Sequence, residues 1–524
     1  MEINHKLIDS SKVQFREYQV RIAEGVLNNG NSLVILPTGL GKTIVALLVI
    51  EKKLLEGKHV LFLAPTRPLA EQHQKTLSSL LKIPEGRVVL LTGTTPADKR
   101  AGIWRDAFIV CATPQTVEND LRAGRISLEG FGLCVIDECH RSVKRYAYTF
   151  VADECKKKGV QLLGLTASPG GKKERVEAVT KALDVTHIEI RTETDLDVAP
   201  YVKRLETNWV EVELPPEFNE LKEKLEEVVS ERLEPLMKMH LINTTSPRIP
   251  KRLLLDAGKK LVALPDSNKL KFVMLSHYAT AMNLTHALEL LETQGISAFL
   301  SFFEKLEARE QKSKAVKRIL EDMRIKWLIR KANDLRNNGE HPKLAKLVEI
   351  IRERNGKKII VFVQFRDQIK RIVDELIAHG ITARQFIGRK DGVTLKEQKE
   401  TIQKFREGEF DVMVASSIGE EGLDIPSVDS VIFYEPVPSE IRLIQRRGRA
   451  GRAKSGEVIF LITKGTRDEA YYWASKSREA KMKKIVKGMQ SELAIKKFFE
   501  KHLGRKEQEA VNLKPGQAKM TDFF

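Results

Sequence analysis

A loop of small residues between two apolar runs constrains the possible folds of this chain more than any other feature. Residues 37–43 (P-T-G-L-G-K-T) follow the apolar run 33–36 and precede a longer apolar run at 44–50. This order predicts a buried strand, a loop and a helix. Backbone N–H groups at the start of such a helix converge on an anion, most simply a phosphate. The sequence therefore predicts a phosphate-binding loop within an α/β sheet.

The residue types in this loop suit a nucleoside triphosphate. Lys42 is expected to reach the terminal phosphates of ATP, and the Thr43 hydroxyl to hold Mg²⁺. The general pattern G-x-x-x-x-G-K-[ST] has glycine at the position of Leu36. The loop alone is therefore a weaker match, and an ordinary strand-to-helix turn is the alternative. The other predicted ATP contacts in this stretch are Leu36, Pro37, Thr38, Gly39, Leu40 and Gly41.

A helical pattern begins just before the loop, at residues 15–19. The amide of Gln19 has a donor beside an acceptor, which matches the edge of adenine. Arg16 and Gln19 are therefore candidate ATP contacts, and the start of a plain surface helix is the alternative.

Two carboxylates, Asp137 and Glu138, follow the apolar run 133–136. Carboxylates at the end of a buried strand are costly unless they hold a cation or a water. We expect Asp137 to complete the Mg²⁺ shell and Glu138 to position or deprotonate the attacking water. A strand-ending acidic turn is the alternative.

Apolar runs at 60–63, 88–91, 109–112 and 162–165 also end in small or hydroxyl-bearing residues. Alternating strands and helices predict a parallel sheet with helices on both faces, with ligands at the carboxyl ends of the strands. Hydroxyls and backbone N–H groups there can hold a phosphate backbone without reading bases. The predicted nucleic-acid contacts in this half are Thr66, Arg67, Thr92, Gly93, Thr113 and Pro114.

The second half of the chain repeats the α/β pattern without a phosphate loop of its own. Apolar runs at 358–363, 412–415, 431–434 and 458–462 predict the strands. Gln364 and Phe365 end the first of them and are expected to contact nucleic acid. Residues 445–452 (Q-R-R-G-R-A-G-R) hold four arginines, which by themselves suit a nucleic-acid patch.

Between the two α/β blocks, residues 215–338 show helical spacing and no strong strand signal. Lys317, Arg324 and Lys331 recur at every seventh position, so they would share one face of one helix. A basic stripe suits binding to a duplex backbone, and a solvated amphipathic helix is the alternative. The predicted domains are 1–205, 215–338, 340–475, a basic helical extension 476–512 and a tail 513–524.

Taken in order, these motifs resemble a superfamily-two helicase of the DEAH-like kind, with D-E-C-H at residues 137–140. A helical insertion at this place is similar to that of the Hef helicase and Fanconi anaemia M protein family. Dicer and the innate RNA-sensor helicases also carry one. The resemblance implies two RecA-like domains around an all-α, thumb-like insertion, with ATP and Mg²⁺ as cofactors. The implied activity is ATP-driven translocation on, or unwinding of, forked or branched DNA in repair.

The resemblance also assigns residues in the second half. Gln445 would face the γ-phosphate, and Arg449 and Arg452 would act as arginine fingers. Gly422 and Asp424 would line the ATP cleft from the same side. Hef proteins also carry a C-terminal nuclease with an E-R-K signature, which does not appear in this sequence, so cleavage activity is not predicted.

The last eight residues resemble a motif that binds the sliding clamp (PCNA), Q-x-x-aliphatic-x-x-aromatic-aromatic. The matching residues are Gln517, Met520, Phe523 and Phe524. These apolar side chains follow a Pro-Gly break and have no core to join, which is unusual for a solvated tail. A frayed tail is the alternative.

Composition narrows the class of protein. The formal net charge of +18 in 524 residues indicates a polyanionic partner. The four cysteines form no C-x-x-C pair, so neither a disulfide scaffold nor a zinc site is expected. No basic-then-apolar leader or membrane-spanning run is seen, so we expect a cytoplasmic, nucleoid-associated protein of a prokaryotic or archaeal cell without a membrane partner.

Two other functions stay open from sequence. One is an RNA-directed helicase or a duplex-RNA-stimulated ATPase. The other is a nucleic-acid scaffold with a decayed ATP site, which the intact Lys42, Asp137 and Glu138 argue against.

Overall fold

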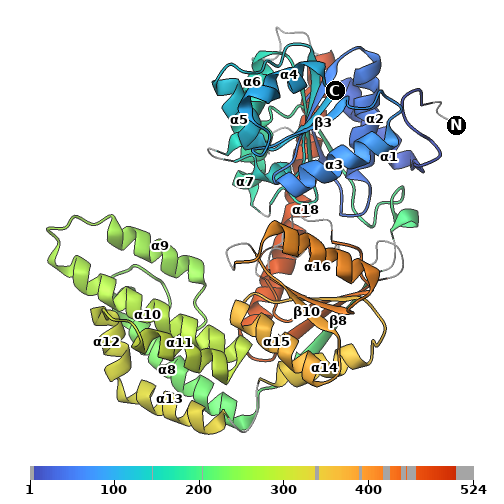
Figure 1. The fold of residues 1–524 in the computed structure, drawn as a ribbon. Coiled ribbons are helices and arrows are strands. Elements are labelled where there is room, and N and C mark those ends of the chain that lie inside the picture. The colour runs from blue at the N-terminus through green and yellow to red at the C-terminus, as the bar shows by residue number, and fades with distance from the viewer. Residues whose placement is uncertain are drawn as a thin grey trace, which may run out of the picture.

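The chain folds into two α/β lobes and a helical bundle (Figure 1). The structure, a computed structural model, describes residues 5–143, 146–170, 172–202, 205–336, 341–388, 392–416, 425–437, 439, 444, 446 and 456–502. In Figure 1 the first lobe is blue, the bundle is green to yellow and the second lobe is orange. This arrangement confirms the predicted architecture of two parallel-sheet domains around an all-α insertion.

The first lobe is a seven-stranded sheet in the order β3-β4-β2-β5-β6-β1-β7, and every strand pair is parallel. Its strands are β1 (Ser32–Ile35), β2 (His59–Leu63), β3 (Val88–Leu91), β4 (Ile109–Ala112), β5 (Phe131–Ile136), β6 (Gln161–Thr166) and β7 (His187–Ile190). Its helices are α1 (Glu17–Asn29), α2 (Lys42–Leu55), α3 (Arg67–Leu80), α4 (Ala97–Asp106), α5 (Pro114–Arg122), α6 (Ala147–Lys157) and α7 (Lys173–Ala182), with short 3₁₀ turns η1 (Cys139–Arg141) and η2 (Ala199–Tyr201).

The apolar runs of the sequence become strands because both faces of this sheet are covered. Along β2, Leu61 packs into one hydrophobic cluster while Val60 and Phe62 pack into another. This alternation follows from the two-residue period of a strand. A sheet buried on both faces requires continuous apolar runs, which is the pattern that the sequence shows. All four cysteines are free and buried in this lobe, as expected of small apolar residues.

The second lobe is a six-stranded parallel sheet in the order β10-β11-β9-β12-β13-β8. Its strands are β8 (Leu205–Val212), β9 (Ile359–Phe362), β10 (Ala383–Phe386), β11 (Val412–Ala415), β12 (Ser430–Phe433) and β13 (Gly456–Thr463). Helices α14 (Pro342–Arg352), α15 (Arg366–Ala378) and α16 (Leu395–Glu407) cover it.

Strand β8 departs from the predicted domain boundaries. It pairs with β13 along all of its length, although it precedes the insertion in sequence. The second lobe therefore begins at residue 205, where the first domain was expected to end. β8 escaped prediction because it is an edge strand with largely exposed side chains, including Glu206 and Trp209, and so lacks an apolar run.

The described residues of the insertion form helices joined by loops, with no strand among them. Its helices are α8 (Pro216–Lys238), α9 (Lys251–Val262), α10 (Lys269–Gln294), α11 (Ile296–Glu307), α12 (Lys314–Glu321) and α13 (Met323–Leu335). They share one hydrophobic cluster that includes Leu225, Leu284 and Phe299.

The basic stripe does not lie on one helix as predicted. The helix ends at Glu321, and Asp322 begins the next one by accepting a hydrogen bond from Arg324 N at 3.0 Å. Asp is a poor residue for a helix interior and a good N-cap, which explains the break. Lys317 therefore lies on α12, while Arg324 and Lys331 lie on α13.

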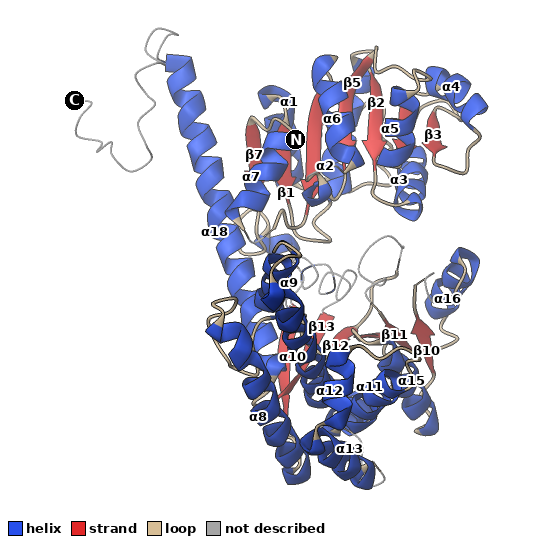
Figure 2. Cartoon of the chain, turned by 90° about the vertical axis from the view of Figure 1, so that its left-hand side faces the viewer, coloured by secondary structure: helices blue, strands red, loops and turns tan. Residues whose placement is uncertain are grey.

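A single helix, α18 (Arg467–His502), connects the lobes (Figure 2). It begins in the second lobe, and Met482 and Val486 are buried in a hydrophobic cluster of the first lobe. The boundary expected between residues 475 and 476 falls inside this helix. The many lysines of this segment suggested a separate basic extension. The apolar residues spaced among them instead pack against the first lobe, so the helix joins the second lobe to the first. Among the described residues, no helix is both long and apolar enough to cross a bilayer.

Candidate nucleotide and nucleic-acid sites

The predicted phosphate loop lies between β1 and α2. Gly39 and Gly41 have φ angles of 83° and 79°, a region that side chains disfavour. Gly41 is the N-cap of α2, so the loop presents the free N–H groups of a helix start. Lys42 Nζ donates to the Leu36 carbonyl at 3.1 Å, and Thr43 lies in the first turn of α2. This geometry fits an anion site.

Replacing Gly41 by Ala is expected to damage the loop more than replacing Gly39 by Ala. Both glycines have positive φ, so each substitution strains the backbone by about 1–2 kcal/mol. A Cβ on Gly41 would also overlap Gln19 Nε2, whereas a Cβ on Gly39 meets nothing within 4 Å. The melting temperature and the affinity for a fluorescent ATP analogue measure the difference. Equal losses in the two variants would contradict the role of the Gly41–Gln19 contact.

Gln19 lies beside the phosphate loop and is bonded to it. Its Nε2 donates to the Leu40 carbonyl at 3.1 Å, and its Oε1 accepts from Arg16 N at 3.1 Å. Tyr18 OH donates to the same carbonyl at 2.6 Å. The Arg16 guanidinium lies 5.0 Å from the ring centre of Tyr201. The start of α1 therefore supports the loop, and contact of Arg16 and Gln19 with adenine stays a prediction.

Asp137 is buried at the end of β5. Burial by itself would raise its pKa, but a hydrogen bond from His73 and the charge of Lys42 hold the pKa below its ordinary value. Its Oδ2 lies 2.9 Å from His73 Nε2, and its backbone carbonyl accepts from Tyr148 OH at 2.8 Å. An ionised carboxylate near the phosphate-loop lysine is the ligand that Mg²⁺ prefers.

Glu138 follows with a left-handed backbone, φ 50°. Its Oε2 is buried and accepts no hydrogen bond from the described residues, although His140 Nδ1 lies 3.2 Å away. A buried carboxylate oxygen without a donor fits a group that engages a water or a cation in the loaded enzyme. The residues Thr43, Asp137 and Glu138 thus suit Mg²⁺ and an attacking water.

Sequence reasoning missed His73 and Tyr148 near these carboxylates, and it placed Thr166 and Ser168 at a strand end without giving either a specific role. Thr166 Oγ1 lies 3.2 Å from His140 Nδ1, and Ser168 Oγ donates to the sulfur of Met482 in α18 at 2.8 Å. The end of β6 therefore links the acidic motif to the helix that connects the lobes. The threonine and serine that end this strand were visible in the sequence, whereas nothing local marked His73.

The predicted nucleic-acid contacts of the first lobe lie at strand ends on one edge of the sheet. Thr66 is the N-cap residue of α3, and its Oγ1 is buried without a partner among the described residues. Thr92 and Thr113 bond neighbouring threonines at 3.0 Å and 2.9 Å. A Cβ on Gly93 would meet only open space. Arg67 and Pro114 open α3 and α5.

In the second lobe, Gln364 and Phe365 end β9 and lead into α15. Gln364 N donates to the carboxylate of the buried Glu435, and its side chain is exposed. The Phe365 ring lies 6.2 Å from that of His286 in α10. Phe365 therefore lies where the second lobe meets the bundle.

Glu435 makes stability depend on pH. Burial raises its pKa to about 7 from 4.5, so the neutral carboxyl is favoured in the folded lobe. A carboxyl with a raised folded pKa loses stability as pH rises from about 4.5 to 7. Glu435→Gln is expected to raise the melting temperature at pH 8 relative to the native chain and to leave it little changed at pH 5.

Glu457 provides a control, because its substitution should change the stability at pH 8 in the opposite direction. Its hydrogen bond with Arg354 lowers its pKa, so Glu457→Gln is expected to destabilise the chain at pH 8. A Glu435→Gln variant that melts at or below the temperature of the native chain at pH 8 would contradict the assignment.

Several predicted residues lie outside the described part of the chain. They are Gly422, Asp424, Gln445, Arg449, Arg452, Gln517, Met520, Phe523 and Phe524.

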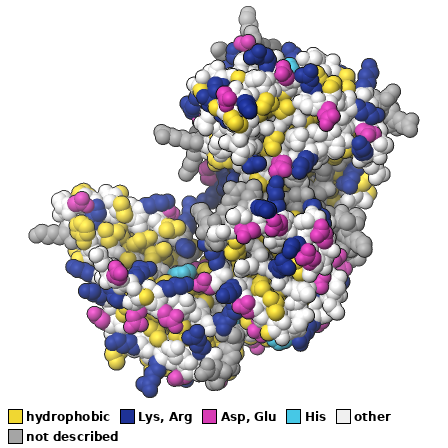
Figure 3. All heavy atoms as spheres, viewed as in Figure 1, with side chains coloured by type: hydrophobic (Ala, Val, Ile, Leu, Met, Phe, Trp, Pro, Cys, Tyr) yellow, Lys and Arg dark blue, Asp and Glu magenta, His cyan; other side chains and the backbone are white. Residues whose placement is uncertain are grey.

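The predicted basic residues of the insertion differ in their surroundings. Arg324 pairs with Glu231 and Asp322, and Lys331 lies 3.4 Å from Glu220. Lys317 instead lines an open hollow of about 470 Å³ with Lys314, Arg318 and Arg232 and with two carboxylates, Glu321 and Asp322, of which Asp322 pairs with Arg232. Lys and Arg side chains otherwise spread over both lobes and the bundle on the face seen in Figure 3. Lys314, Lys317 and Arg318 of α12 are therefore better candidates for phosphate contact than the basic residues of α13.

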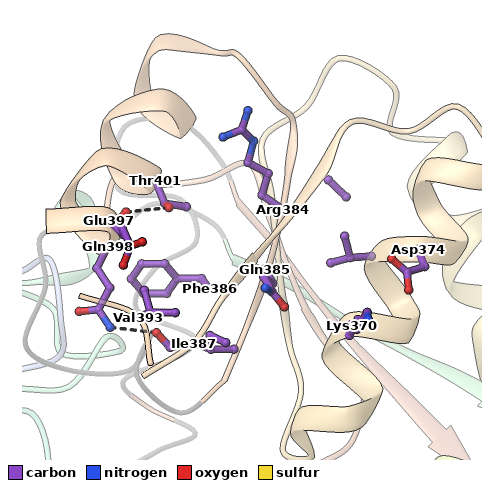
Figure 4. Close-up of a pocket in the computed structure, with 12 residues that line it drawn as sticks. Lys370, Asp374, Arg384, Gln385, Phe386, Ile387, Val393, Glu397, Gln398 and Thr401 are labelled. Carbon is purple, nitrogen blue, oxygen red and sulfur yellow. Dashed lines mark hydrogen bonds between the residues drawn. The ribbon is translucent and has the colours of Figure 1, made fainter. Parts of the chain in front are cut away.

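A cavity of about 420 Å³ at the outer edge of the second lobe is not the nucleotide site (Figure 4). It lies beside the edge strand β10, and its lining includes Lys370, Arg384 and Phe386. Gln398 Nε2 at its wall donates to the Ile387 carbonyl at 2.9 Å. The cavity is far from the phosphate loop in the chain path, and none of its lining residues belongs to a predicted ATP motif.

Comparison with protein families agrees with the fold. Residues 16–176 match the family described as "DEAD/DEAH box helicase", and residues 342–454 match "Helicase conserved C-terminal domain". Residues 217–339 match a helical bundle described for an ATP-dependent RNA helicase. Two RecA-like lobes with a phosphate loop and a D-E-C-H motif thus define the class, a superfamily-two helicase core.

The chain belongs more narrowly to the Hef and Fanconi anaemia M family of these helicases. It is 45% identical to the crystallised Hef helicase domain of Pyrococcus furiosus, with a TM-score of 0.71, over 90% of this chain and 100% of that one. This comparison confirms the predicted resemblance.

Curated relatives extend beyond the matched region. An ATP-dependent RNA helicase of Methanocaldococcus jannaschii is 41% identical over 93% of this chain and 63% of its own length. The ATP-dependent DNA helicase MPH1 of Pyricularia oryzae is 35% identical over 90% of this chain and 46% of its own. The ATP-dependent DNA helicase fml1 of Schizosaccharomyces pombe is 30% identical over 93% of this chain and 61% of its own length. The chain thus spans less than two thirds of each.

Proposed function

We propose that this chain is an ATP-driven DNA helicase or translocase that acts on forked or branched DNA in repair. The observation that carries the proposal is the Lys42–Asp137–Glu138 cluster at the end of a parallel sheet, in a chain of which 90% matches the whole of the Pyrococcus furiosus Hef helicase domain. Relatives named as DNA helicases support DNA as the substrate.

The residues around the phosphate loop have distinct roles in ATP hydrolysis. Lys42 and the N–H groups at the start of α2 bind the phosphates, and Thr43 and Asp137 hold Mg²⁺. When bound there, Mg²⁺ would supply positive charge that offsets the charge developing on the phosphates. Glu138 orients the attacking water and accepts its proton. Gln445 would contact the γ-phosphate, and Arg449 and Arg452 would act as arginine fingers, which raise kcat by about 10³–10⁵.

Strand-end residues of both lobes hold one nucleic-acid strand through its phosphates. Closure of the lobes on ATP and release after hydrolysis move the lobes along that strand. Helix α18 supports this coupling, because it begins in one lobe and is packed in the other. We place the protein with DNA in the cytoplasm of a prokaryotic or archaeal cell.

The test compares ATPase stimulation by a DNA fork, a Holliday junction, a linear DNA duplex and an RNA duplex at one salt concentration. Salt must be fixed because phosphate contacts weaken steeply as it rises. We expect the fork or the junction to stimulate most. Equal stimulation by linear duplex and by fork would refute the preference for branched DNA.

An RNA-directed helicase is the second candidate. It is favoured by the names of the Methanocaldococcus relative and of the Arabidopsis relative, a "DEAD-box ATP-dependent RNA helicase FANCM". The 2′-hydroxyl distinguishes the substrates. Greater stimulation by the RNA duplex than by any DNA would replace the first proposal with this one.

The tail residues Gln517, Met520, Phe523 and Phe524 bind a sliding clamp in this proposal. Fluorescence anisotropy of a peptide of residues 517–524 is expected to show binding to the clamp. Phe523→Ala together with Phe524→Ala should remove that binding, and a native peptide that does not bind would refute the proposal.

A further inference from the structure

His73 is a buried histidine that no ATP or nucleic-acid motif includes. Its Nε2 lies 2.9 Å from Asp137 Oδ2, and both side chains are about a tenth exposed. A carboxylate can only accept, so His73 Nε2–H is the donor. The ring centre lies 4.4 Å from that of Phe62 in β2, which fixes the orientation of the imidazole. The bond occupies one oxygen of Asp137 and leaves Oδ1 for other contacts.

Helix α3 carries this histidine and begins at predicted nucleic-acid contacts. Arg67 is its first residue and Thr66 its N-cap, about 9 Å along the axis from His73 at 1.5 Å per residue. The same helix meets the second lobe, where Lys399 Nζ lies 3.0 Å from Glu71 Oε2. A shift of α3 would therefore move the donor that holds Asp137.

We propose that His73 is a positioning residue that orients Asp137 for Mg²⁺ and makes the metal site respond to nucleic acid bound at the start of α3. The response to nucleic acid rests on the proposed function, whereas the orientation of Asp137 by His73 does not. Partners that hold a ligating carboxylate set its direction and its affinity for the ion.

The test uses the length of the side chain at position 73 in the full chain. The amide nitrogen of Gln falls near the position of histidine Nε2, whereas that of Asn falls near Nδ1. His73→Gln therefore keeps the bond to Asp137, and His73→Asn breaks it while staying polar. The measurements are Mg²⁺ titrations of the binding of a slowly hydrolysed fluorescent ATP analogue, and the ratio of fork-stimulated to basal ATPase.

We expect His73→Asn to need about tenfold more Mg²⁺ for half-maximal nucleotide binding, the lower end of the effect of losing such a partner. Its stimulation ratio is expected to fall toward one. His73→Gln should stay within about twofold of the native chain in both measurements. The control is His59→Gln in β2, which breaks the 2.7 Å contact between His59 Nδ1 and the Ala107 carbonyl far from the acidic motif.

Three outcomes would overturn the proposal. Unchanged Mg²⁺ dependence in His73→Asn refutes the positioning role, and equal loss in Asn and Gln variants assigns the effect to packing on Phe62. A shifted Mg²⁺ dependence with an unchanged stimulation ratio refutes the link to nucleic acid. If no nucleic acid stimulates the native chain, the proposed function fails, and the Mg²⁺ titration still decides the role of His73.

Discussion

Glu138→Gln is expected to lower the kcat of ATP hydrolysis by about 10²–10⁴, the usual range for a lost general base. The amide has the shape of the carboxylate and cannot take the proton of the attacking water. Nucleotide affinity should stay within a few-fold, because the proposed phosphate contacts, Lys42 and the start of α2, do not involve Glu138. Steady-state ATPase assays with and without fork DNA, beside equilibrium binding of a fluorescent ATP analogue, measure the two quantities.

The same substitution should leave stability nearly unchanged. Glu138 Oε2 accepts no hydrogen bond from the described residues, and both Glu and Gln must adopt the φ of 50° at this position. Glu129→Gln is a matched control on the same lobe, because Glu129 is exposed and pairs with Lys158 at 3.0 Å. Full turnover in Glu138→Gln, or a loss of nucleotide binding that explains the lower rate, would refute the role of Glu138.

Asp468→Asn is expected to have the largest effect on stability, about 3–5 kcal/mol. Asp468 and Lys343 form an ion pair in which neither side chain is exposed to solvent. The substitution leaves the Lys343 ammonium buried without its counter-charge, while the amide oxygen can still accept from Thr463 N. The pair joins the start of α14 to the start of α18, so its loss should loosen the second lobe.

Removing the charge of Lys343 as well should restore much of the stability that Asp468→Asn loses. The double variant Lys343→Met, Asp468→Asn removes both members of this ion pair, so the two effects should be non-additive by more than about 1 kcal/mol. Amide hydrogen exchange in β9 and β13 reports the opening of this lobe, which a global melt of several domains does not isolate.

An exposed pair on the same helix supplies the comparison. Lys346 and Glu349 lie 2.6 Å apart in α14 with 36% and 55% of their side chains exposed. Glu349→Gln should lower the free energy of unfolding by less than about 1 kcal/mol, because solvent screens exposed ion pairs. Similar losses in Glu349→Gln and Asp468→Asn would show that burial does not decide the effect.

Much of the fold follows from local patterns. Continuous apolar runs marked β2, β4, β5, β9 and β11, because a strand covered on both faces must be apolar at every position. The edge strands β8 and β10 gave no such signal, since part of each lies exposed. The break at Asp322 was hidden within a helical repeat, because a seven-residue spacing does not report where one helix ends.

The candidate site likewise has features that could be predicted from the sequence and others that could not. The positions of Lys42, Thr43, Asp137 and Glu138 beside strand ends were predictable, because each proposed role requires a residue type at a fixed distance from a strand end. The bond of Gln19 to the Leu40 carbonyl was not predictable, because it depends on how α1 packs against the loop.

The sequence by itself determined the two α/β blocks, the helical insertion and the position of the phosphate loop and acidic motif at strand ends, since periodicity and turn residues record burial and backbone geometry locally. Only the tertiary structure decided that His73 donates to Asp137, that β8 joins the second sheet, and that α18 ties both lobes together. These contacts join segments 64 residues apart for His73 and Asp137 and more than 240 apart for β8 and β13. Contacts over such distances depend on the path of the whole chain, which no local pattern encodes.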